Sequence, residues 1–298
     1  MSEGSARPVV AAVDGTEQSL RALDWAADEA GIRDRRLRVV YAFEWPMRRV
    51  AAMGAPGFDP DEFARRILED ARQRVEARTP EVAIDPVYVD GDPVPVLLTQ
   101  AKEAEVLVLG SRGLGTLGSA VLGSTGMQLA TAAACPVVVV PSRTTGPRSG
   151  RVAVAVDGSP ASLAALDWAF TVAEDHDATL SAIMVCDDPP SLFTGPLAKA
   201  AYRGPSETER AAAQEIAHQL LADATAPGRE LHPQVRVTEV VAAGHAAQEL
   251  IGEAEEADLL VVGSRGHGGF AGMLLGSVSH AVLTHSTRPV AVVRAPRD

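Results

Sequence analysis

Two motifs rich in glycine and serine, identical in spacing, are the residues best suited to chemistry in this chain. Gly110-Ser111-Arg112-Gly113 is followed by nine residues and Gly123-Ser124, and Gly263-Ser264-Arg265-Gly266 is followed by nine residues and Gly276-Ser277. Glycine lets backbone N–H groups approach a ligand closely, because no Cβ stands in the way. A helix that opens at Gly123-Ser124 or Gly276-Ser277 would add unpaired N–H groups and a favourable dipole. Each half of the chain is therefore predicted to bind phosphate groups, although the glycines could also serve only as tight turns.

An aspartate accompanies each motif. Asp14 lies in Val13-Asp14-Gly15-Thr16, and Asp157 lies in the matching Val156-Asp157-Gly158-Ser159. A carboxylate beside a phosphate site can bind a ribose hydroxyl or Mg²⁺. Both aspartates are therefore candidate Mg²⁺ ligands. The alternative is an ordinary turn carboxylate. Arg112 and Arg265 could pair with phosphate, which guanidinium suits, or could lie on the surface.

The chain offers no catalytic base that both motifs could share. All seven histidines fall between His176 and His285, and the only lysines, Lys102 and Lys199, lie outside the motifs. The P-loop sequence G-K-[ST] does not occur. We therefore expect binding with little or no hydrolysis. His267, where the first half has Leu114, predicts a different pH response at the second site unless its side chain points into solvent.

Short apolar segments that alternate with helical ones must position these residues. Strands are expected at 8–13, 37–42, 82–89, 106–109 and 136–140, and their Val and Leu content indicates burial on both faces, as in a parallel sheet. Thr16 and Ser159 are expected to cap helices, and Gly31 to end one. Pro86 predicts that the third strand lies at the sheet edge.

The whole pattern is present twice. Ala22-Leu23-Asp24-Trp25-Ala26 recurs unchanged 143 residues later, and the glycine motif recurs at an offset of 153. We predict two duplicated α/β domains, 1–141 and 151–298, joined by a polar linker at 142–150. Each should be a doubly wound parallel sheet that binds its ligand at the carboxyl ends of the first and fourth strands.

Composition narrows the class of partner. The net charge of −12 argues against nucleic acid. No apolar run is long enough to span a bilayer, and the first residues carry no apolar targeting core, so a cytoplasmic location without membrane contact is expected. Cys135 and Cys186 have no cysteine counterparts in the other half and are expected to be structural thiols.

These motifs resemble the tandem universal stress proteins, whose ATP-binding branch is marked by G-x2-G-x9-G-[S/T]. The resemblance covers essentially the whole chain and implies five-stranded parallel sheets of order 3-2-1-4-5. It also implies a stress-response function in which each domain holds one adenine nucleotide, ATP, with or without Mg²⁺. A slow ATPase, an ATP-splitting ligase of the same broad fold and a nucleotide-free interaction module remain alternatives, although Asp14-Gly15-Thr16-Glu17 departs from the Ser-Gly-Gly-x-Asp loop of the ligases. The resemblance is compatible with a homodimer and with a protein partner that the sequence does not identify.

By position, the resemblance implies that the adenosine lies beside Asp14 and Asp157, and that the backbone at Ala12, Ala42, Ala155 and Val185 borders the base or sugar. The rest of the first site is expected at Gly110, Ser111, Arg112, Gly113, Leu114, Gly115, Thr116, Gly123 and Ser124. The rest of the second is expected at Gly263, Ser264, Arg265, Gly266, His267, Gly268, Gly269, Gly276, Ser277 and Val278.

Overall fold

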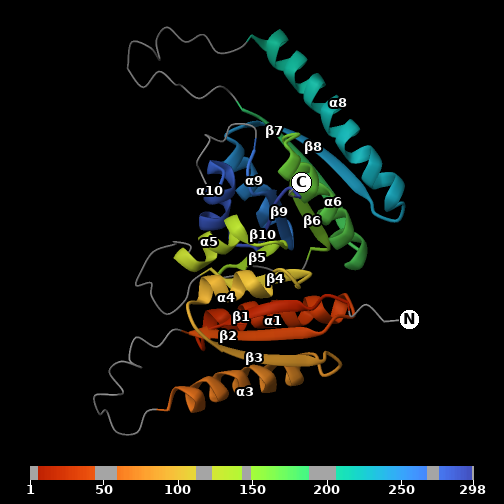
Figure 1. The fold of residues 1–298 in the computed structure, drawn as a ribbon. Coiled ribbons are helices and arrows are strands. Elements are labelled where there is room, and N and C mark those ends of the chain that lie inside the picture. The colour runs from red at the N-terminus through yellow and green to blue at the C-terminus, as the bar shows by residue number, and fades with distance from the viewer. Residues whose placement is uncertain are drawn as a thin grey trace, which may run out of the picture. The chain divides into compact units, whose positions relative to one another are not determined.

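A computed structural model describes residues 6–43, 59–111, 123–142, 149–187, 206–266 and 275–296 (Figure 1). The first half contains β1 (Val9–Val13), α1 (Glu17–Ile32), β2 (Leu37–Phe43), α3 (Pro60–Arg78), β3 (Ile84–Asp90), α4 (Pro93–Gln100), β4 (Val106–Gly110), α5 (Ser124–Ala132) and β5 (Val137–Val140). The second half contains β6 (Arg151–Ala155), α6 (Pro160–Asp175), β7 (Thr179–Asp187), α8 (Glu207–Leu231), β8 (Val237–Gly244), α9 (Ala246–Glu255), β9 (Leu259–Gly263), α10 (Ser277–His285) and β10 (Val290–Val293).

Strands in each half follow the same order. The order is β3-β2-β1-β4-β5 in the first half and β8-β7-β6-β9-β10 in the second, which confirms the predicted 3-2-1-4-5 arrangement. The four strand pairings of the first half are parallel, as are β6–β7, β6–β9 and β7–β8 of the second. Pro86 lies in β3, at the edge of its sheet, where a missing N–H costs no central ladder bond.

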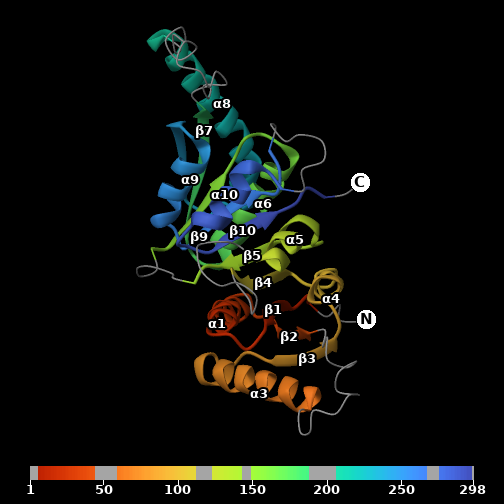
Figure 2. The same ribbon diagram turned by 90° about the vertical axis from the view of Figure 1, so that its left-hand side faces the viewer.

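The central strands are buried because helices cover both faces of each sheet. The valines and leucines of β1 and β4 are almost wholly inaccessible to solvent. Figure 2 shows α1 on one side of the first sheet and α4 and α5 on the other. The chain divides into two compact units, one comprising Met1–Thr144 with Pro289–Val292 and the other Thr145–Arg288 with Val293–Asp298. Within the described ranges, no helix is both long enough and apolar enough to cross a membrane.

Helix boundaries largely follow the expected capping residues. Thr16 accepts a hydrogen bond from the backbone N–H of the third helical residue of α1, and Ser159 does the same for α6. The expectation for Gly31 was wrong, because α1 continues through it to Ile32. The left-handed residue that reverses the chain is instead Asp34, with φ of 51°, whose short polar side chain tolerates this conformation.

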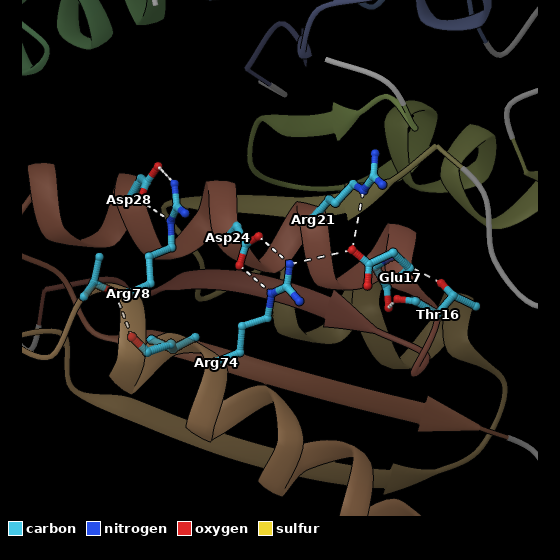
Figure 3. A network of polar contacts seen from close by, with 10 residues as sticks. Thr16, Glu17, Arg21, Asp24, Asp28, Arg74 and Arg78 are labelled. Carbon is cyan, nitrogen blue, oxygen red and sulfur yellow. Dashed lines mark hydrogen bonds and ion pairs between the residues drawn. The ribbon is translucent and has the colours of Figure 1, made fainter. Parts of the chain in front are cut away.

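Ion pairs fix α3 of the first half to α1, the helix that follows the predicted site aspartate. Arg74 makes two hydrogen bonds of 2.7 Å to Asp24, and Arg78 makes bonds of 2.7 and 2.8 Å to Asp28 (Figure 3). The hydrogen bonds with Asp24 raise the pKa of Arg74. Arg74 also lies 3.8 Å from Glu17, the first residue of α1. Such paired bonds fix direction as well as distance, so they help to orient the N-terminus of α1.

Candidate functional site

A cavity of about 310 Å³ lies at the carboxyl ends of β1, β2 and β4 in the first half. The predicted site residues that line it are Ala12, Asp14, Ala42, Gly110, Ser111, Gly123 and Ser124. These residues come from four separate segments of the chain, and the parallel sheet brings them together where the strand order reverses.

The second half has a cavity of about 370 Å³ in the equivalent place. The predicted residues that line it are Ala155, Asp157, Val185, Gly263, Arg265, Gly266, Gly276, Ser277 and Val278. Ser264 is buried and is not among the described lining residues. Eight predicted residues, Arg112, Gly113, Leu114, Gly115, Thr116, His267, Gly268 and Gly269, lie outside the described ranges. The structure thus gathers most of the predicted residues around two cavities, and nucleotide binding by them stays a prediction.

A short hydrogen-bonded turn holds Asp14 at the rim of the first cavity. Its Oδ1 accepts hydrogen bonds from the backbone N–H of Thr16 at 3.0 Å and from the Thr16 hydroxyl at 2.6 Å. The backbone N–H of Asp14 donates to the Ser19 hydroxyl at 3.2 Å. Gly15, with φ of 81°, provides the left-handed residue between them. The carboxylate is therefore held in place by its own turn.

The second half repeats this turn, with Ser159 in the place of Thr16. Asp157 Oδ1 accepts from the backbone N–H of Ser159 at 2.9 Å, and the Asp157 N–H donates to the Ser162 hydroxyl at 3.3 Å. Ser19 and Ser162 also line their cavities, and the sequence analysis missed both. Alignment of the two halves at the offset of 143 could have found them, because serine recurs at that position.

The third glycine of each motif has no structural reason to be glycine. Gly123 has φ of −60° and ψ of 152°, and Gly276 has φ of −66° and ψ of 150°, values that any residue adopts. A Cβ on Gly123 would lie 3.9 Å from its nearest neighbour, the Ser111 carbonyl oxygen. A Cβ on Gly276 would lie 3.6 Å from Arg265 Cα. Neither backbone strain nor packing against the described residues requires glycine here, so what glycine preserves among these residues is open space in the cavity.

The first glycine of each motif does have a structural role. A Cβ on Gly110 would lie 3.1 Å from the Gln18 carbonyl oxygen, and one on Gly263 would lie 2.8 Å from the Ser162 nitrogen. These positions let the strand end approach the helix that packs across it. Gly266 is different again, because a Cβ there would collide with Asp157 Oδ2. The glycines of one motif therefore serve different purposes.

The helices that open at these cavities begin at residues without a capping side chain. The N-cap residues of α5 and α10 are Gly123 and Gly276, and no described side chain caps either helix, whereas Thr16 and Ser159 cap α1 and α6. First-turn N–H groups without a side-chain partner carry the positive end of the helix dipole and favour an anion. Two such helix starts, each beside a cavity, are suited to hold phosphate groups.

Few charged side chains occur among the described residues that line the two cavities. Among the described lining residues, Arg265 is the only cationic side chain, and Asp14 and Asp157 are the only carboxylates. The described ranges contain no cluster of three or more histidine, cysteine or acidic side chains that could hold a metal ion. The described residues therefore offer a polar ligand backbone N–H groups, serine hydroxyls, one carboxylate in each cavity and Arg265 in the second.

Tyr41 of β2 lies near Asp14 but is fully buried. Its ring stacks on that of Tyr88, with centroids 5.8 Å apart. Burial, followed by the proximity of Tyr88 and of Asp14, raises its pKa to about 12. The phenol therefore stays neutral at physiological pH. The second half has Met184 at this position, so Tyr41 takes no part in chemistry common to both cavities.

Apolar walls that the sequence analysis missed complete both cavities. Val40 and Leu97 line the first, and Ile183 and Leu250 line the second. These pairs lie at the offsets of 143 and 153 that relate the two halves. The repeat alignment therefore held the signal, but apolar residues in a strand or helix are indistinguishable from core until the cavity is known.

The fold and the paired cavities define the class of protein: a duplicated, doubly wound α/β protein with one cavity at the strand ends of each domain. The model of the universal stress protein family matches residues 5–141 and 149–294, and the chain belongs to this family as a tandem member.

Relatives resemble the chain over nearly its full length. Universal stress protein Rv2005c of Mycobacterium tuberculosis is 34% identical over 296 residues, which cover 96% of each chain. Universal stress protein Rv2623 of the same organism is 32% identical over 308 residues, which cover 99% of each. The crystal structure of a universal stress protein from Archaeoglobus fulgidus matches with a TM-score of 0.66 at 21% identity, covering 99% of this chain and 98% of that one, and this likeness supports the fold alone.

Proposed function

We propose that each domain binds one adenine nucleotide, preferably ATP, and that the protein acts in the stress response as a regulatory nucleotide-binding protein with little or no hydrolysis. The observation that carries the proposal is the pair Gly123 and Gly276. Both adopt ordinary backbone conformations, and both leave room in a cavity next to uncapped helix N–H groups. A bound phosphate chain explains both features together.

The remaining parts of each cavity suit a nucleoside. The apolar walls and the backbone at Ala12, Ala42, Ala155 and Val185 would border the base and sugar, and the fixed carboxylate of each domain would accept a hydrogen bond from a ribose hydroxyl. A single carboxylate also fits Mg²⁺, which commonly takes one or two protein carboxylates and completes its shell with phosphates and water. The proposed first site is therefore the cavity that contains Asp14, and the proposed second site is the cavity that contains Asp157.

Slow turnover follows from the residues that line the cavities. Among those that the structure describes, neither cavity has a histidine or lysine, and only the second has an arginine. Binding that stabilises ground state and transition state equally does not accelerate phosphoryl transfer. We expect a rate far below the typical enzyme value of about 10 per second. Turnover at that rate, lost when Asp14 and Asp157 are changed to alanine, would favour the alternative of an ATPase.

Direct identification of the ligand is the sharpest test. Freshly purified protein would be heat-denatured and the supernatant analysed by chromatography and mass spectrometry, and nucleotide-free protein would then be titrated with ATP by calorimetry. We expect released adenine nucleotide and a stoichiometry of two per chain. Failure of stripped, folded protein to bind ATP at either cavity would refute the proposal and favour a nucleotide-free interaction module.

A further inference from the structure

Different side chains contact the described first residues of the two glycine motifs. In the first half, Gln18 Nε2 donates a hydrogen bond of 2.6 Å to the Ser111 hydroxyl, so the first turn of α1 reaches across to the end of β4. In the second half, Ala161 stands in the position of Gln18, at the offset of 143. Alanine cannot make this bond, so the equivalent residue of the second half provides no counterpart to it.

In the second motif, two serine side chains bond to main-chain carbonyl groups instead. The Ser159 hydroxyl donates to the Arg265 carbonyl oxygen at 3.1 Å, and the Ser279 hydroxyl donates to the Gly263 carbonyl oxygen at 2.6 Å. Gly126 replaces Ser279 in the first half. Gln18 is thus the described residue whose side chain holds the first loop, and it does so through a side-chain hydroxyl.

This difference decides what Ser111 can offer a ligand. A serine hydroxyl has one proton to donate and two lone pairs to accept with. Because Ser111 Oγ accepts the N–H of Gln18, its own proton remains available for another acceptor. Ser111 lines the first cavity, whereas the equivalent Ser264 is buried and is not among the described residues that line the second.

We propose that Gln18 is a positioning residue that directs the Ser111 hydroxyl toward ligand phosphate and so gives the first site an additional donor for ATP. The inference rests on the proposed nucleotide binding. Gln18 is not among the described lining residues, and it acts on the ligand through Ser111. The expected consequence is an effect that depends on phosphate, because adenosine has no phosphate group for this hydroxyl to bind.

The first site can be studied alone in a Gly276→Val background, where the second cavity is blocked. There, Gln18→Ala should weaken ATP binding about tenfold, as expected for the loss of one well-oriented hydrogen bond to a charged group, and leave adenosine affinity unchanged. Ser111→Ala should match it, and the double variant should be no weaker than either single variant. Gln18→Glu should be weaker than Gln18→Ala, because a carboxylate would accept the Ser111 proton and repel phosphate.

Two controls separate this role from general damage. Gln18→Ala in a Gly123→Val background should leave ATP affinity at the second site unchanged, and thermal unfolding should show that every variant is folded. Equal losses of ATP and adenosine affinity, additive effects of the two alanine substitutions, or wild-type ATP affinity in Gln18→Glu would overturn the assignment to Gln18 while nucleotide binding stands. A wild-type protein without nucleotide binding would overturn both proposals.

Discussion

Replacing Gly123 or Gly276 by valine should remove one nucleotide site without unfolding the protein. Each glycine lies at an N-cap in an extended conformation that valine readily adopts, and a Cβ at either position meets protein atoms only at ordinary contact distances. Valine is a poorer N-cap than glycine, at a cost of about 1 kcal/mol. The melting temperature should therefore fall by only about 2–4 °C.

The effect on binding should be much larger. The added methyl groups occupy the space beside the uncapped first turn of α5 or α10, where phosphate would accept N–H bonds. Hydrogen bonds to a charged group contribute about 1.5–3 kcal/mol each, so losing two raises the dissociation constant roughly 100-fold or more. The stoichiometry measured by calorimetry should drop from two to one in each single variant and to zero in the double variant.

Gly252→Ala provides the matched control for an added Cβ. Gly252 lies in α9, where a Cβ would have no packing neighbour within 4 Å, and it is not among the described cavity-lining residues. This variant should keep two sites. If both valine variants also bind two nucleotides with wild-type affinity, the argument from open space is wrong and the phosphates do not lie beside these helix starts.

Two further predictions concern stability and reactivity. Burial opposes ionisation of Glu239, but hydrogen bonds from Arg229 and Thr225 outweigh it and lower the pKa of this carboxyl. The contribution of this ionised carboxyl to stability is therefore present above the unfolded pKa of about 4.3 and is lost as pH falls through the lower folded pKa. Glu239→Gln should lower the free energy of unfolding, measured with urea, by about 1 kcal/mol at pH 7 and by progressively less below pH 4. A difference that stays constant across this range would contradict the ion pair. Burial raises the pKa of the Cys135 thiol to about 12, whereas Cys186 is partly exposed. A thiol reagent at pH 8 should therefore modify Cys186 in the native protein and Cys135 only after unfolding. Single alanine variants would identify the reacting residue, and equal reaction rates of the two thiols in the native protein would contradict this prediction.

Much of the fold could be predicted because local signals and the repeat agree. Apolar runs of valine and leucine gave five strands in each half, and Pro86 correctly indicated an edge strand. The end of α1 was mispredicted because Gly31 fits within the helix, while Asp34 adopts the left-handed conformation instead. Glycine is only the commonest residue at such positions, and the pattern alone does not show which residue takes positive φ.

The cavity was less predictable than the sheet. Spacing identified the glycine motifs, but it did not distinguish Gly110, which allows close packing against α1, from Gly123, which leaves open space. That distinction depends on which atoms surround each Cα. Gln18 was missed for a related reason, since its bond to Ser111 joins residues 93 positions apart and only one half of the chain has it.

The duplication itself separates shared chemistry from differences between the sites. A property common to both cavities must come from residues present twice, and among the described residues these include the aspartate turn, its serine partner and the Gly-Ser pair at the helix start. All of them suit binding, and none is a strong base or a cation. One residue that differs, Gln18 opposite Ala161, contacts Ser111 at the start of the first glycine motif. Two sites that share a binding chemistry but differ in their loop supports would differ in affinity, so the chain could respond to nucleotide over a wider concentration range than one site allows.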